Sequence, residues 1–269
     1  MTIFEAVAFG FVQGITEFLP VSSSGHLVLA HSLFGVQGTS DLAFDAILHV
    51  ATALAVVVYF RCDIMVLVNT ALRKLGRLPV NPRDMSLLMA IIVGTIPAVV
   101  FGLLLESTME TLFRNPLLVA GVLVAGSMLF IYAEWVYINS PRDDEMTVKK
   151  GLKIGFFQSL ALIPGMSRSG ASIAGGMLLG LSRSEAARFS FLMAIPVILG
   201  AGAKKMLEMM TSNEVIAWGP VSVGAVTAFI TGLIAVHFML SFIRKHSLWP
   251  FIWYRIILAT FVVLLIYFG

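Results

Sequence analysis

Six apolar runs, spread over the whole chain, constrain what this sequence can fold into. Each is close to the length of about 20 residues with which a helix spans a hydrocarbon core. Lipid cannot satisfy the polar groups of an open strand, and no alternating barrel pattern is present, so helices are expected. The sequence therefore predicts an all-α polytopic membrane protein, one domain over residues 1–269, with about six transmembrane helices. The runs are residues 44–60, 86–105, 117–138, 189–205, 219–240 and 251–268.

Composition excludes several other classes of protein. Charged residues make up 12% of the chain and the mean hydropathy is +0.94, whereas soluble domains carry about 25% charged residues. The single cysteine, Cys62, excludes an internal disulfide and a cysteine-based metal cluster. Asp45 and His49 have the spacing of a metal-binding pair but lack an evident third ligand. The basic residues lie in loops, so no nucleic-acid partner is expected despite a net charge of +3.

An internal repeat links the start of the chain to its second half. The stretch "GFVQGITEFLPVSSSGH" begins at Gly10, and "GFFQSLALIPGMSRSGAS" begins at Gly155. Glycine, phenylalanine, glutamine and serine residues recur 145 positions apart. Chance identity between two glycine- and serine-rich membrane segments is the alternative explanation. The constant offset favours a true repeat, with copies covering approximately residues 1–115 and 116–269.

Charge distribution predicts that the two copies have opposite orientations. The arginine-rich segment 61–85 is expected to be cytoplasmic. The span 44–60 then runs inward and its counterpart 189–205 runs outward, although Lys204 and Lys205 depart from the rule. Each segment before the repeated proline is too short to cross the bilayer. We expect two re-entrant helical hairpins, around residues 1–43 and 150–182, that meet near the midplane as in other inverted repeats.

Arg168 lies in the second hairpin, where an unpaired charge is costly. A guanidinium presents a rigid fork of donors that matches phosphate oxygens. If the hairpins meet, serines of both would surround it, and helix N-termini would favour an anion. A structural role in helix capping or helix packing is the alternative. The predicted phosphate-binding residues are Ser22, Ser24, Gly25, Ser167, Ser169, Gly170 and Ser172.

Two residues of the first hairpin are candidates for proton transfer. Glu17 could act as a counter-ion of Arg168, as a general base or as a metal ligand. His26 could act as a general acid or base, or could be a hydrogen-bonded interfacial histidine.

At these motifs the sequence resembles the undecaprenyl-diphosphatases, also called bacitracin-resistance proteins, over essentially its whole length. The motifs are "TEFLPVSSSGH" and "PGMSRSGAS". The resemblance implies a bacterial inner-membrane enzyme that hydrolyses undecaprenyl diphosphate to the monophosphate and so regenerates the lipid carrier of cell-wall synthesis. It also implies six spans with two re-entrant hairpins, an active site open to the periplasm, and dependence on a divalent cation, Mg²⁺ or Ca²⁺.

The family's functional residues fall on specific positions of this chain. Its glutamate matches Glu17, its serines match Ser22 and Ser23, its histidine matches His26, and its arginine matches Arg168. Ser167 and Ser169 flank that arginine. Gln13 stands where many members carry a second glutamate, so a metal site at Gln13 and Glu17 would have one carboxylate. Ser24 and Ser172 stand where many members carry threonine.

The resulting hypothesis is phosphoryl transfer to Ser23, with Glu17 or His26 accepting its proton; direct attack by water is the competing route. A transporter or flippase of an anionic polyprenyl lipid is the alternative function, because inverted repeats with polar hairpins also occur in transporters. A purely structural scaffold would leave Arg168 unexplained. The expected partners are the polyprenyl diphosphate and membrane lipid, and the oligomeric state is open, with a homodimer as one alternative.

Overall fold

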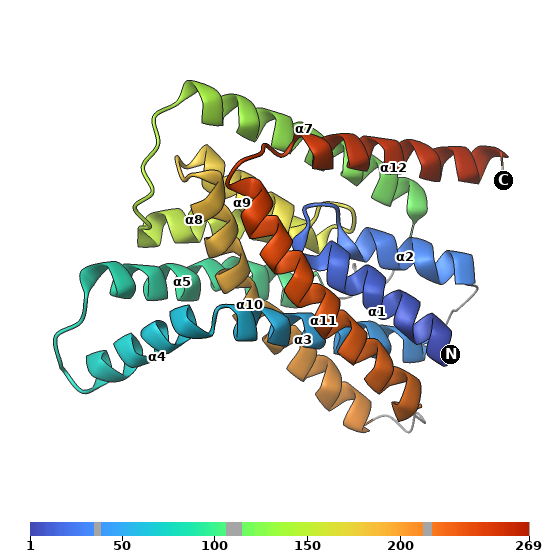
Figure 1. Ribbon diagram of the computed structural model, residues 1–269, viewed down its shortest axis with the longest axis horizontal. Coiled ribbons are helices and arrows are strands. Elements are labelled where there is room, and N and C mark those ends of the chain that lie inside the picture. The colour runs from blue at the N-terminus through green and yellow to red at the C-terminus, as the bar shows by residue number, and fades with distance from the viewer. Residues whose placement is uncertain (35–38, 106–114, 212–216, 269) are drawn as a thin grey trace.

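The computed structural model describes residues 1–34, 39–105, 115–211 and 217–268, and within these ranges the regular structure is helical throughout. The order of elements along the chain is shown in Figure 1. The elements are α1 (Ile3–Phe18), α2 (Ser23–Phe34), α3 (Thr39–Tyr59), α4 (Arg61–Leu75), α5 (Pro82–Leu104), α7 (Pro116–Asn139), α8 (Val148–Ser159), the 3₁₀ turn η1 (Leu160–Leu162), α9 (Arg168–Leu178), α10 (Arg183–Thr211), α11 (Trp218–Ile243) and α12 (Trp249–Phe268).

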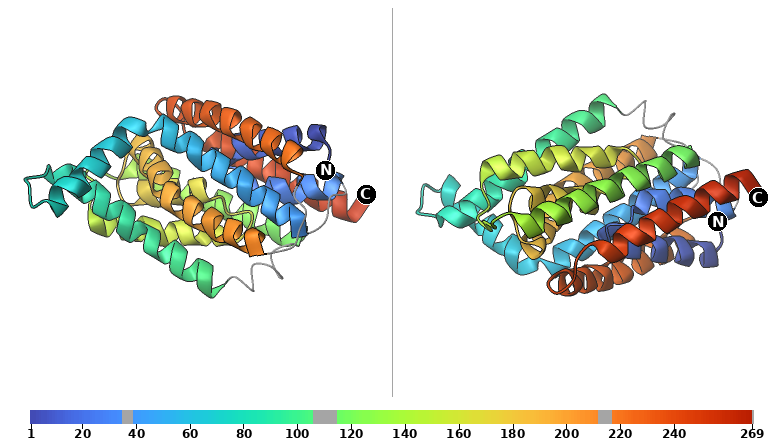
Figure 2. Two further views of the ribbon diagram at one scale, coloured as in Figure 1. Left: turned by 90° about the horizontal axis from the view of Figure 1, so that it is seen from below. Right: turned by 90° about the horizontal axis from the view of Figure 1, so that it is seen from above.

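Long apolar helices confirm the predicted multi-pass membrane protein. Five of them, α5, α7, α10, α11 and α12, are long and apolar enough to cross a bilayer. A sixth span arises if α3 and α4, which bend by 81° at their junction, are counted together. These helices coincide with the six apolar runs of the sequence. Both views of Figure 2 place the chain termini at the same end of the helix bundle.

The starts of two spans follow from a repeated Asn-Pro pair. Asn81 caps α5 by accepting the backbone N–H of Arg83, and Asn115 caps α7 by accepting the N–H of Leu117. In each case the proline occupies the first turn, where its missing N–H removes no helical hydrogen bond. The residues at which these two helices begin are therefore determined by the neighbouring sequence.

The two copies of the repeated motif fold into similar helical hairpins, α1–α2 and α8–α9. Ser22 and Ser167, which are 145 residues apart, both adopt left-handed backbone angles, with φ of 74° and 72°. Each side chain accepts a backbone N–H at the start of the following helix, from Gly25 and Gly170 respectively. This conformation is unfavourable for a residue with a Cβ atom. Its occurrence at both positions shows that the repeat extends to backbone geometry.

Each hairpin packs against a helix of the other half of the chain. Helix α1 lies along α11, and α8 lies along α5 (Figure 1). The backbones approach closely at glycines, as in many membrane helix pairs. A Cβ atom on Gly10 would lie 2.3 Å from the carbonyl oxygen of Gly224, and one on Gly155 would lie 2.2 Å from that of Gly94. These contacts leave no room for larger side chains.

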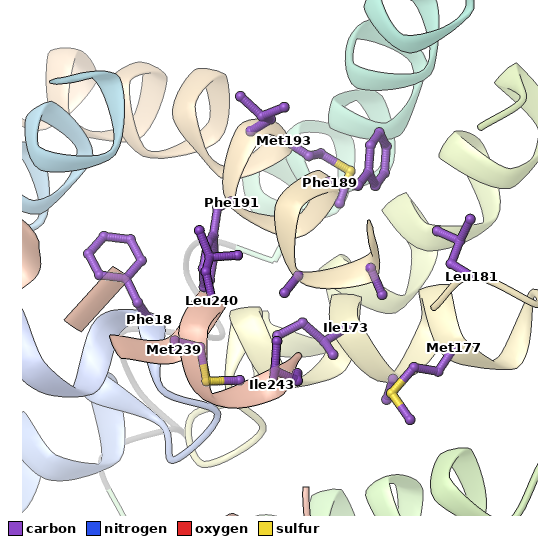
Figure 3. Close-up of a cluster of buried hydrophobic side chains, with 14 of the residues drawn as sticks. Phe18, Ile173, Met177, Leu181, Phe189, Phe191, Met193, Met239, Leu240 and Ile243 are labelled. Carbon is purple, nitrogen blue, oxygen red and sulfur yellow. The ribbon is translucent and has the colours of Figure 1, made fainter. Parts of the chain in front are cut away.

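A buried apolar cluster joins the first hairpin to the second and to the spanning helices. Figure 3 shows side chains from α1, α9, α10 and α11 pointing toward one another. Phe18 packs edge to face on Phe191 with ring centroids 5.5 Å apart, and Ile173 and Met239 belong to the same cluster. Lipid tails are as apolar as these side chains, so close packing stabilises the contact. Phe18 follows Glu17 directly, and the cluster thereby fixes the end of α1 that carries this glutamate.

Candidate functional site

The carboxylate of Glu17 is the centre of the candidate site. Its side chain is 4% exposed. Oε1 accepts a hydrogen bond from Arg168 Nη2 at 2.7 Å, and Oε2 accepts one from Ser23 Oγ at 2.6 Å. Gln13 Nε2, one helical turn earlier on α1, also donates to Oε2 at 2.9 Å. Both hairpins therefore supply side chains to the same carboxylate.

The internal repeat explains how Ser23 and Arg168 come to face each other. They are 145 residues apart, so they occupy the same position in the two copies. Each is the first residue of its helix, α2 or α9, directly after a left-handed serine cap. The two hairpins meet at their turns, and this brings the two positions together. The site thus pairs a hydroxyl from one copy with a guanidinium from the other.

Arg168 has an unused donor in this arrangement. Its side chain is 15% exposed, and Nη2 contacts Glu17. Its Nη1 atom is buried and has no hydrogen-bond partner among the described residues. A buried, unsatisfied, charged donor costs free energy. An anionic oxygen bound at Nη1 would remove that cost while leaving the contact with Glu17 intact.

His49, on α3, is a neighbour of Glu17 that the sequence did not indicate. Its Nε2 lies 3.5 Å from Glu17 Oε2, and its Nδ1 donates to the backbone carbonyl of Asp45 at 2.8 Å. The carboxylate of Asp45 instead contacts His31. The structure therefore directs the imidazole of His49 toward Glu17 instead of pairing it with the Asp45 carboxylate as a metal site. No local pattern links residues 17 and 49, so only tertiary packing shows this contact.

His26 faces a different group. Its Nδ1 donates to the carbonyl of Ser22 at 2.8 Å, which leaves Nε2 as the acceptor of the Tyr254 hydroxyl at 2.7 Å. The two rings are stacked, with centroids 5.7 Å apart and planes inclined by 9°. The nearest proton acceptor to Ser23 is therefore Glu17, and His26 is bound to α12.

Four of the predicted phosphate-binding residues form the caps of the hairpin helices. The hydroxyls of Ser22 and Ser167 accept the N–H groups of Gly25 and Gly170 at 3.3 and 3.2 Å. These side chains are 1% and 6% exposed. They shape the turns on which Ser23 and Arg168 are carried.

The remaining predicted serines make contacts within and between the hairpins. Ser24 Oγ lies 3.4 Å from the Ser22 hydroxyl. Ser169 Oγ donates to the carbonyl of Leu19 at 3.2 Å and so joins the two turns directly. Ser172 Oγ contacts the carbonyl of Arg168 and the hydroxyl of Ser190, on α10, both at 2.6 Å. Ser172 therefore ties α9 to α10.

The donor set fits a divalent cation only in part. No group of three or more histidine, cysteine, aspartate or glutamate side chains is arranged as a metal cage within the described ranges. Gln13 presents its amide nitrogen to Glu17, while its Oε1 is buried without a partner. Mg²⁺ commonly binds through one or two carboxylates together with substrate phosphates. Glu17 can fill the role of that single carboxylate.

The chain is similar in sequence to one family of bacterial proteins over nearly its whole length. Residues 6–261 match the family described as "Bacitracin resistance protein BacA". The undecaprenyl-diphosphatase of Marinobacter nauticus is 39% identical over 259 residues, which cover 96% of this chain and 97% of the relative. The undecaprenyl-diphosphatase of Rubrobacter xylanophilus is 40% identical and covers 99% of both chains. That of Saccharophagus degradans is 40% identical over the full length of both.

Proposed function

Because the chain belongs to the bacitracin resistance protein BacA family, we propose that it hydrolyses undecaprenyl diphosphate to undecaprenyl phosphate and inorganic phosphate. The reaction recycles the lipid carrier of bacterial cell-wall synthesis. The observation that carries the proposal is the meeting of Glu17, Ser23 and Arg168 from two hairpins of a multi-pass membrane protein. A hydroxyl, a proton acceptor and a guanidinium with a free donor are the groups that phosphoryl transfer requires.

Arg168 binds the terminal phosphate in this mechanism. Nη2 donates to Glu17, while Nη1, which has no partner among the described residues, donates to a phosphate oxygen. As the phosphorus is attacked, negative charge gathers on its oxygens, and a fixed guanidinium in a site with little water stabilises that charge strongly. The bound phosphate also places negative charge beside Glu17, which favours transfer of a proton to the carboxylate.

Ser23 is the nucleophile. Its hydroxyl already donates to Glu17 Oε2 at 2.6 Å, so the proton acceptor is in place before substrate binds. Oγ forms a bond to the terminal phosphorus, the bond from that phosphorus to the bridging oxygen breaks, and undecaprenyl phosphate leaves with the electron pair. Glu17 takes the serine proton and passes it to the departing undecaprenyl phosphate, which returns Glu17 to the carboxylate form. Water then attacks the phosphoserine and gives a proton to Glu17. Glu17 delivers that proton to Ser23 Oγ as the bond from phosphorus to Oγ breaks and inorganic phosphate departs.

A divalent cation, Mg²⁺ or Ca²⁺, is part of the proposal. Glu17 would hold it together with oxygens of the diphosphate, and the side-chain oxygen Oε1 of Gln13, which has no partner among the described residues, would be a second protein ligand. When bound, the cation neutralises phosphate charge. The residues of the chain keep the roles given above. We place the protein in the bacterial inner membrane, with the site open to the periplasm.

Transport of an anionic polyprenyl lipid is the second candidate function, because two hairpins of opposite orientation also form binding sites in transporters. Catalysis is favoured by the Ser23–Glu17 hydrogen bond, since a transporter needs an anion site but no proton acceptor for a hydroxyl. The experiment measures phosphate release from undecaprenyl diphosphate by purified protein in detergent, where no compartments exist. Transport alone releases none.

The same assay, applied to the variant Arg168→Gln, tests whether Arg168 binds the transferred phosphate. We expect phosphate release to fall by a factor of about 10³, because the donor to the transferring group is lost. Ser159→Ala is the control, since Ser159 bonds to a carbonyl of its own helix. Release at the wild-type rate by the Arg168 variant would place the site elsewhere.

A further inference from the structure

Arg255 is an arginine inside a membrane-spanning helix that the mechanism above does not use. It lies on α12, and its side chain is fully buried, with 0% of its surface exposed. Among the residues that the structure describes, no carboxylate pairs with it. A buried charge at this depth is costly, and such residues are functional by default.

The guanidinium of Arg255 donates to the turns of both hairpins at once. Nη1 contacts the carbonyl of Pro20 at 3.4 Å in the first turn and that of Met166 at 3.2 Å in the second. Nη2 contacts the carbonyl of Gly165 at 2.9 Å. Ser23 follows Pro20 by three residues, and Arg168 follows Met166 by two. The same side chain therefore contacts the backbone beside both reacting positions.

Helix α7 provides the other side of this cluster and lies along α12 (Figure 1). Nε of Arg255 donates to the hydroxyl of Ser127 at 3.3 Å, and Nη2 donates to the carbonyl of Leu123 at 3.1 Å. The ring of Phe130 lies 4.8 Å from Cζ. Carbonyl dipoles and the aromatic face take the place of a counter-ion.

A glycine of α7 makes room for the guanidinium. A Cβ atom on Gly126 would lie 2.1 Å from Arg255 Nη2 and 3.1 Å from Cζ, so a side chain there would displace the arginine. Gly121, on the same helix, has no atom within 4 Å of its would-be Cβ position. The two shortest contacts at Gly126 are thus with the arginine, and the third is with Met166 Sδ of the second turn, at 3.2 Å.

We propose that Arg255 is a positioning residue that fastens the two hairpin turns to each other and to α7, and so holds Ser23 and Arg168 on either side of Glu17. A guanidinium has several N–H donors spread over a plane, so it can donate to carbonyl oxygens of three segments at once. The ammonium of lysine concentrates its donors on one atom and cannot reach all three. The effect on catalysis rests on the proposed phosphatase function, whereas the effect on the turns does not.

The test compares three variants in detergent: Arg255→Lys, Gly126→Ala and the control Gly121→Ala. Two quantities are measured: kcat and KM for phosphate release, and hydrogen–deuterium exchange of peptides that cover residues 19–22 and 163–167. We expect both Arg255→Lys and Gly126→Ala to lower kcat by about 10- to 100-fold, as for a reacting group displaced by a fraction of an ångström to one ångström. KM should change less than kcat, and exchange should rise at both turns together. Gly121→Ala should match the wild type.

Several results would overturn the proposal. One is wild-type exchange at either turn in Arg255→Lys, and another is equal behaviour of the two glycine variants. A uniform rise in exchange over the whole protein would show a general structural role and would also overturn it. If Arg255→Lys does not fold, Gly126→Ala still decides, because that variant keeps the arginine in the chain. If the wild type releases no phosphate but exchange still rises at both turns in Arg255→Lys and Gly126→Ala, the phosphatase function is refuted. The role of Arg255 in holding the turns together then stands.

Discussion

Replacement of Glu17 by glutamine separates a proton acceptor from a simple counter-ion. Glutamine has nearly the same shape, so its oxygen can still accept a hydrogen bond from Arg168 or Ser23. It cannot accept the serine proton. General base catalysis contributes about 10²–10⁴-fold, which corresponds to about 3–5 kcal/mol of transition-state stabilisation. We expect kcat of Glu17→Gln to fall by that factor.

Substrate affinity should behave differently from kcat in this variant. Loss of the carboxylate charge leaves Arg168 without a competing anion, so the guanidinium can bind phosphate with both Nη atoms. With a chelator present, so that no cation held at Glu17 contributes to affinity, we expect undecaprenyl diphosphate to bind at least as tightly as it does to the wild type. Binding is measured at equilibrium with the inactive variant, and kcat is measured from phosphate release at saturating substrate.

The chain contains a matched control for this substitution. Glu134, on α7, is also almost fully buried, at 1% exposure, and forms an ion pair with Arg183. It also accepts the backbone N–H of Leu248, and among the described residues it forms no hydrogen bond or ion pair with the hairpin turns. Glu134→Gln should lower the melting temperature without changing kcat. A kcat of Glu17→Gln within about threefold of the wild type would refute the role of Glu17 as base, because a shift of that size is far below the general-base range.

Three further predictions follow from the same contacts. Rapid quenching of the reaction with labelled substrate should trap phosphoserine in the wild type and none in Ser23→Ala; an active Ser23→Ala would instead support direct attack by water. A chelator should abolish phosphate release by the wild type, and Mg²⁺ or Ca²⁺ should restore it; activity that persists in chelator would exclude the cation held at Glu17. Gly155→Ala should lower the stability by about 1–3 kcal/mol through overpacking against Gly94, whereas Gly200→Ala, with open space around it, should not; equal melting temperatures would contradict the close α5–α8 crossing.

Several features of the fold were predictable because they depend on neighbouring residues. Apolar runs of sufficient length determine the spans, and the Asn-Pro pairs before α5 and α7 determine where two of them begin. The repeat was visible as identity at a constant offset. Glu17 and Arg168 were prominent candidates because a charge inside an apolar segment is unfavourable unless it has a partner or a ligand.

Arg255 interrupts the apolar run 251–268 and is unfavourable there for the same reason, so it was a further candidate visible in the sequence. Its partners could not have been read from the sequence in any case. Apart from the Ser127 hydroxyl and the Phe130 ring, they are backbone carbonyls of three segments, and a carbonyl has no residue identity. The structure alone shows which carbonyls lie within reach of the guanidinium.

The sequence did not show which histidine lies beside Glu17. His26 lies within ten residues of Glu17 and was, with Glu17, one of two candidates for proton transfer, yet its ring is bound to Tyr254. His49, on another helix, is the histidine that faces the carboxylate. The sequence by itself determined the membrane class, the hairpins and the residues of the charged pair, because these follow from local composition and repetition. Only the tertiary structure decided which side chains meet, because that depends on how helices distant in the chain pack.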